Sequence, residues 1–135
     1  MNPLIPCIWL AGAIHLFIVA MNVPLPRMLG YREELARVSP IIRQIFTVHS
    51  IYIILVLIGF SVLCFRFAPQ LAGESPIGVF LSGCLAVFWT LRLIIQLFYY
   101  DAKLKRTYRT VHLAFTLAIG FLSGVFAIAA WGIVK

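Results

Sequence analysis

The sequence predicts an all-α integral membrane protein, a four-helix bundle with antiparallel, up-down topology. Of its 135 residues, 63% are hydrophobic and only 11% are charged, whereas a soluble domain carries about a quarter charged residues. The mean hydropathy is +1.05, which leaves too few polar side chains to cover a surface in water. Four apolar runs each reach about 20 residues or more, enough to cross a hydrocarbon core of about 30 Å.

The four runs predict helices over residues 4–23, 41–65, 77–100 and 110–134 of a single domain, 1–135. Lipid cannot satisfy exposed backbone groups, so these segments must be helical. The pairs Ser39-Pro40 and Ser75-Pro76 precede the second and third runs. Each pair fits an N-cap residue followed by proline in the first helical position. The first ten residues contain no Lys or Arg, so we expect no cleaved signal peptide.

The charges predict an orientation. The chain has 11 Lys and Arg against 4 Asp and Glu, a net charge of +7. The basic residues gather in the first and third connections, which places both loops in the cytoplasm and both termini outside. We expect a bacterial inner membrane, with anionic lipid headgroups near these loops, and no nucleic-acid partner. Within the first connection, Tyr31–Val38 is predicted to form a short interfacial helix.

The few polar side chains inside the spans fall in one layer. At a rise of 1.5 Å per residue they lie about 5–13 Å from the inner boundary. An ionisable group at such a depth costs free energy and needs a partner. The candidate site residues from the four helices are His15, His49, Arg92, Gln96, Tyr99 and His112. Their convergence predicts a polar pocket in the cytoplasmic half.

Helical spacing supports an inward direction for most of them. One stripe of the third helix contains Trp89, Arg92, Gln96 and either Tyr99 or Tyr100. Small residues, which mark helix contacts in membranes, share a face with two of the histidines. They are Ala11 and Gly12 beside His15, and Thr116, Gly120, Ser123 or Gly124, and Ala127 beside His112.

Arg92 has no countercharge within the spans, because all 4 acidic residues lie in the connections. Two interpretations are open. The guanidinium could reach the headgroups or bond to polar groups of the bundle. Alternatively, it could bind an anion from outside the chain, such as a haem propionate, a phosphate or the carboxylate of another subunit.

Three hypotheses follow for the polar layer. In the first, His15 and His49 ligate the iron of haem b, or a quinone is held by a histidine, Tyr99 or Gln96 with help from Arg92. Such a chain would be a non-catalytic or electron-transfer subunit of a larger complex. In the second, the three histidines bind zinc, copper or iron in a membrane enzyme. HExxH spacing, however, is absent from the sequence.

The third hypothesis is a structural or assembly subunit without a cofactor, in a larger membrane complex or a homo-oligomer. Transport is less favoured, because the spans contain neither a carboxylate nor a pair of broken helices. Gly78 and Gly83 are interpreted as packing residues. Cys7, Cys64 and Cys84 show no CxxC spacing and are interpreted as small apolar residues; a disulfide between Cys7 and Cys64 is the alternative.

Overall fold

The computed structural model describes residues 2–132, and every regular element in this range is helical. Four helical segments are long and apolar enough to cross a membrane. They are α1 (Leu4–Met21), α4 (Pro40–Arg66), α5 with its extension η2 (Pro76–Ile94 and Ile95–Tyr99), and α7 (Arg109–Trp131). The prediction of an all-helical chain with four helices long and apolar enough to span a membrane is therefore confirmed.

The predicted helix bounds agree with the observed ones within a few residues. The first helix ends at Met21, where residue 23 was predicted, and the predicted end of the fourth at Val134 lies outside the described residues. The short helix predicted over Tyr31–Val38 is present as α3 (Tyr31–Ala36). Three further short elements were not predicted: α2 (Leu25–Met28), η1 (Gln70–Glu74) and α6 (Ala102–Thr107).

The two Ser-Pro pairs begin helices, but only one serine caps through its side chain. Ser75 Oγ accepts a hydrogen bond of 3.1 Å from the Gly78 amide, and Pro76 occupies the first turn of α5. Ser39 also holds the N-cap position, before Pro40, yet its side chain makes no capping bond. The start of α4 therefore has a proline in its first turn but no side-chain cap.

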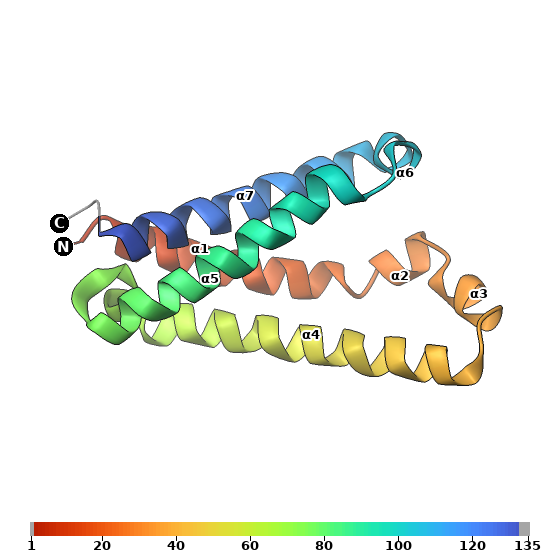
Figure 1. Cartoon of the computed structure of the whole chain (residues 1–135), viewed down its shortest axis with the longest axis horizontal. Coiled ribbons are helices and arrows are strands. Elements are labelled where there is room, and N and C mark those ends of the chain that lie inside the picture. Colours follow the sequence, from red (N-terminus) through yellow and green to blue (C-terminus); the bar gives the residue numbers. More distant parts are fainter. Residues whose placement is uncertain (1, 133–135) are drawn as a thin grey trace.

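The helices form two hairpins. Helix α1 packs along α4, α5 packs along α7, and α1 contacts α7 between the hairpins. Figure 1 shows the start of α1, the turn between α4 and α5, and the end of α7 gathered at one end. From there the hairpins diverge towards the other end, which carries α2, α3 and α6 (Figure 1).

The core lies near the gathered end. On α4 the buried residues begin at Leu57, and on α7 they begin at Ile119. Fully enclosed apolar side chains include Ile8, Leu71, Leu122 and Phe126. Towards α2, α3 and α6 most apolar side chains of α4 are exposed. The polar residues predicted from sequence to share one layer are therefore divided: His15 is buried in the core, whereas Arg92, Gln96 and His112 lie where the hairpins separate.

Close backbone contacts hold the gathered end together. A Cβ on Gly12 would lie 3.1 Å from the Cβ of Cys64, and Ser61 Oγ donates to the Gly12 carbonyl at 3.0 Å. These contacts join α1 to α4. In membranes such packing and hydrogen bonding, more than water exclusion, drives helix association.

The glycines of α5 and α7 differ sharply in their surroundings. A Cβ on Gly78 would overlap the Gln70 carbonyl oxygen at 1.8 Å, so Gly78 is the packing residue it was predicted to be. A Cβ on Gly83 would make only an ordinary contact, 3.8 Å from Ala130 Cβ. Gly120 and Gly124 face open space, so these two glycines do not form the close helix contact expected of them.

Candidate functional site

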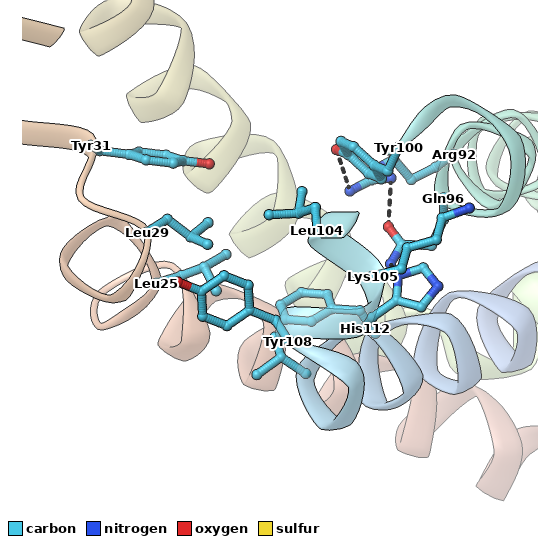
Figure 2. A pocket seen from close by; sticks show the side chains of 12 residues that line it. Leu25, Leu29, Tyr31, Arg92, Gln96, Tyr100, Leu104, Lys105, Tyr108 and His112 are labelled. Carbon is cyan, nitrogen blue, oxygen red and sulfur yellow. Dashed lines mark hydrogen bonds between the residues drawn. The ribbon is translucent and has the colours of Figure 1, made fainter. Parts of the chain in front are cut away.

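A hydrogen-bonded row of side chains connects α5, η2 and α7. Arg92 Nη1 donates to Gln96 Oε1 at 3.1 Å, and Gln96 Nε2 lies 2.9 Å from His112 Nδ1. Arg92 Nη2 donates to the Tyr100 hydroxyl at 3.3 Å, and the guanidinium carbon lies 5.5 Å from the centroid of that ring. Figure 2 shows the row on one wall of a cavity.

The row fixes the direction of its hydrogen bonds. Because Arg92 can only donate, the Gln96 oxygen must accept and the Gln96 amide nitrogen must donate. His112 Nδ1 is then the acceptor, so in the neutral imidazole the proton lies on Nε2. His112 consequently offers an N–H donor, and Arg92 retains N–H groups beyond the two in use.

Tyr100, not Tyr99, completes this row. Tyr99 is 82% exposed and does not line the cavity. The reason is the wider turn of η2, a π-helix over Ile95–Tyr99, after which Tyr100 adopts an extended backbone with ψ of 140°. Regular α-helical spacing could not choose between the two tyrosines, because it does not include the π turn.

The row faces an amphipathic cavity of about 150 Å³. Its lining residues come from α2, α3, α5, η2, α6 and α7, and from the loop ends beside them. The apolar ones are Leu25, Leu29, Leu104, Val111 and Phe115, and the polar ones are Tyr31, Arg92, Gln96, Tyr100, Lys105, Tyr108 and His112. None of these lining residues is acidic, whereas two are cations. Figure 2 shows Leu25, Leu29 and Tyr31 on the side opposite Arg92, Gln96 and His112.

Three of the polar lining residues, Tyr31, Lys105 and Tyr108, come from the connections. Lys105 Nζ donates to the Leu97 carbonyl in η2, and the Tyr108 hydroxyl donates to the Met28 carbonyl at 3.2 Å, which ties α7 to α2. Burial, and secondarily the neighbouring Tyr100, raises the pKa of Tyr31. The Tyr31 hydroxyl thus stays neutral at physiological pH and can donate into the cavity, as its direction in Figure 2 indicates.

His15 is inside the bundle, as predicted, but away from this cavity. It is fully buried, and its ring centroid lies 5.2 Å from that of Trp89, 5.7 Å from Phe60 and 6.2 Å from Phe126. Trp89 precedes Gln96 by seven residues, about 10 Å along the helix. The two groups therefore occupy different layers, because counting residues from the loops ignores how the helices tilt and diverge.

The surroundings of His15 leave one ring nitrogen unmatched. His15 Nδ1 lies 2.6 Å from the Ala11 carbonyl, so Nδ1 is the donor and Nε2 carries a lone pair. Among the described residues, neither His15 Nε2 nor the buried Trp89 Nε1 has a hydrogen-bond partner. The site is a closed aromatic cluster in which His15 supplies the only imidazole.

His49 belongs neither to the Arg92 cavity nor to the aromatic cluster around His15. It lies on the exposed side of α4, with Gln44, Ile45, Val48 and Tyr52 around it. The pair His15 and His49, predicted to ligate haem b, therefore does not line a common cavity. Within residues 2–132, no three His, Cys, Asp or Glu side chains converge as a metal site would require. The interpretation of the three histidines as one metal centre is thus not supported by their positions.

All three cysteines are free: Cys64 is buried, Cys7 is half-buried and Cys84 is exposed. The structure thus agrees with their interpretation as small apolar residues and has no bond between Cys7 and Cys64.

Sequence reasoning missed the residues from the connections that complete the cavity, both the polar Tyr31, Lys105 and Tyr108 and the apolar Leu25, Leu29 and Leu104. They belong to segments that were interpreted only through their charge. The first residue of α3 and the N-cap residue of α7 are both tyrosines, which was the sequence feature that could have indicated an amphipathic wall.

Comparison with known proteins adds no family to this description. No protein-family model, curated protein or solved structure gives a significant match to the chain.

Proposed function

We propose that the chain is a small integral membrane subunit that binds the oxyanion headgroup of an amphiphile, a carboxylate or a phosphate, in the cavity lined by Arg92, Gln96 and His112. The observation that carries this proposal is the composition of the polar wall. It contains the cations Arg92 and Lys105 beside His112, without an acidic residue among the lining side chains.

Electrostatics favours an anion over a neutral ligand. Arg92 is only partly exposed, and the groups that hold it, Gln96 and Tyr100, are uncharged. Charge-assisted hydrogen bonds are about twice as strong as neutral ones, and a low-dielectric surrounding strengthens them further. An oxyanion would therefore gain more from this wall than a quinone carbonyl. The leucines opposite would contact the apolar part of the ligand.

The size of the cavity also suits a headgroup. A volume of about 150 Å³ is below the range of about 300–1,000 Å³ typical of sites that enclose a whole drug-sized ligand. The remainder of an amphiphile would extend between the diverging hairpins. Haem b and quinone remain predictions. The two predicted haem ligands, His15 and His49, do not line the cavity, and His112 is the one histidine among its lining residues.

Arg92→Gln is the variant that tests the proposal. In detergent-solubilised protein, we expect its affinity for oleate and for dioleoyl phosphatidate to fall about tenfold or more, because a charge-assisted bond contributes about 1.5–3 kcal/mol. Binding is measured by native mass spectrometry. Methyl oleate, which lacks the charge, should bind weakly to both proteins.

Arg66→Gln is the matched control, because Arg66 is exposed at the opposite end of α4 and lines no described cavity. It should leave the binding of both probes unchanged. Oleate and phosphatidate separate a free carboxylate from a lipid phosphate. Decylubiquinone binding that depends on Arg92, without binding of either anion, would replace the proposal with a quinone site. If none of the probes binds, the structural hypothesis for the subunit would be preferred.

The same proposal places the ends that carry α2, α3 and α6 in the cytoplasm, with antiparallel spans and both termini outside. It is supported by the basic side chains of these connections, which occur at one end of the bundle (Figure 1): Arg27, Arg32, Arg37, Lys103, Lys105 and Arg106. If the subunit belongs to a complex, the outward His49 and Gln44 would provide polar groups for a partner helix.

The orientation is tested with Glu33→Cys, at an exposed position of α3, in a chain whose native cysteines are replaced by alanine. A membrane-impermeant maleimide should label this cysteine only after spheroplasts are permeabilised. Labelling of intact spheroplasts would reverse the assignment.

A further inference from the structure

A second concave surface lies between α3 and α4, apart from the Arg92 cavity. This groove has a volume of about 670 Å³ and is bounded by the end of α1, by α2, by α3 and by the first half of α4. Its lining residues are Asn22, Pro26, Tyr31, Arg32, Leu35, Ala36, Arg43, Phe46, Thr47, Ser50, Ile51 and Ile54. Tyr31 packs edge-to-face on Phe46, with centroids 5.6 Å apart, and forms the wall between the groove and the Arg92 cavity.

One end of the groove carries two arginines. Arg43 Nε donates to the Leu35 carbonyl at 3.0 Å, which holds the guanidinium across α3 and leaves both terminal nitrogens free to donate. Within residues 2–132 the ion pair is Arg37 with Glu34, so neither Arg32 nor Arg43 has an acidic partner there. Two guanidinium groups that line one groove from adjacent helices, each without an ion-pair partner among the described residues, are chemically suited to a phosphate.

Apart from the two arginines, the groove presents a mainly apolar surface to a ligand. Phe46 and Ile51 are exposed by 39% and 53%, and the polar residues between them bond to their own helix. Thr47 donates to the Arg43 carbonyl at 2.9 Å, and Ser50 donates to the Phe46 carbonyl at 2.8 Å. Both hydroxyl protons are therefore already donated within α4, so these two side chains do not need a hydrogen bond from a ligand.

The dimensions match one leaflet of a bilayer. Arg43 and Ile54 are eleven residues apart, a rise of about 16 Å along α4. Half of a hydrocarbon core is about 15 Å. A molecule with its phosphate at Arg43 would thus bring its apolar end to the middle of the membrane beside Ile54.

We infer that this groove binds one anionic glycerophospholipid, with its phosphate on Arg32 and Arg43 and an acyl chain along Phe46, Ile51 and Ile54. The inference does not depend on the ligand proposed for the Arg92 cavity. A protein helix would suit the apolar floor, but the two arginines and the leaflet-length apolar floor together correspond to a lipid.

The first test uses native mass spectrometry of the full chain in detergent with dioleoyl phosphatidylglycerol, compared with phosphatidylcholine bearing the same tails. The double variant Arg32→Gln/Arg43→Gln should retain phosphatidylglycerol about 30-fold less well, because each arginine near an anionic headgroup contributes about a fivefold factor. Retention of phosphatidylcholine should change less than about twofold by the same reasoning, since it carries no net charge.

The control Arg106→Gln/Arg109→Gln removes two exposed charges from the same end of the bundle, and neither residue lines the groove. It should retain phosphatidylglycerol like the unchanged chain. An equal loss in both double variants would overturn the inference and show a general charge effect. Circular dichroism and monomeric elution establish that each variant is folded.

A second measurement locates the acyl chain directly. Phosphatidylglycerol with a photoreactive diazirine in its chain should label the peptide that contains Phe46, Ile51 and Ile54, and the label should decrease in Arg32→Gln/Arg43→Gln. Labels spread evenly over the exposed faces of α5 and α7 would contradict the site. Crosslinking of this peptide to another protein in native membranes, with no lipid adduct, would assign the groove to a protein partner.

Discussion

Replacing Gly78 with alanine is expected to lower the free energy of unfolding by about 3 kcal/mol or more, the upper end of the cost of overpacking a core. The new Cβ would lie 1.8 Å from the Gln70 carbonyl oxygen and 2.3 Å from its carbon, both backbone atoms of η1. A backbone cannot rotate away as a side chain can. The turn would have to move, which would also break the 2.8 Å bond from Ser82 Oγ to the Leu71 carbonyl.

Thermal and denaturant unfolding in detergent measure this effect, with Gly59→Ala as the matched control. A Cβ on Gly59 meets nothing within 4 Å, and alanine has a helix propensity about 1 kcal/mol better than that of glycine. Gly59→Ala should therefore be neutral or slightly stabilising. Equal stabilities for the two variants would show that η1 does not pack against α5 as described.

His15→Ala is expected to cost about 2–5 kcal/mol of stability, as for other large side chains removed from a core. The ring is fully buried and contacts aromatic side chains of α4, α5 and α7 (Phe60, Trp89 and Phe126). Its removal would leave a cavity where all four spanning helices meet. His49→Ala, at an exposed position, should stay within about 0.5 kcal/mol of the unchanged chain.

His15→Phe separates packing from chemistry. It retains an aromatic ring but loses the bond to the Ala11 carbonyl, so its stability should lie between those of His15→Ala and the unchanged protein. An equal, small effect of His15→Ala and His49→Ala would contradict the burial described. A Soret absorption band that disappears in a folded His15→Phe variant would restore the haem hypothesis.

The spans were predictable because apolar length and composition determine them directly. The two Ser-Pro pairs even located two helix starts. The side chains that converge were harder to predict, because convergence depends on how the helices cross. His15 and His112 were both predicted in the inner half, about 10 and 5 Å from its boundary, yet one contacts Trp89 and the other Gln96, residues about 10 Å apart along the helix.

Arg92, Gln96 and His112 could be grouped from sequence because the first two share a helical stripe and His112 begins the neighbouring helix. The exposure of His49 could not be predicted, because both sides of α4 are apolar and nothing in its spacing marks an inward face. Tyr100, not Tyr99, contacts Arg92 because of the π turn of η2. No residue type in this segment predicts where such a turn occurs.

The contact between α1 and α7 has a consequence for how the protein is made. Synthesis runs from α1 to α7, so His15 of α1 is made well before Phe126 of α7, which packs beside it. Until α7 is made, α1 packs mainly on α4, and its imidazole has Phe60 and Trp89 beside it but not Phe126. The bundle can be completed only after α7 has been synthesised, so a nascent chain stalled before α7 would present an incomplete bundle to membrane chaperones and proteases.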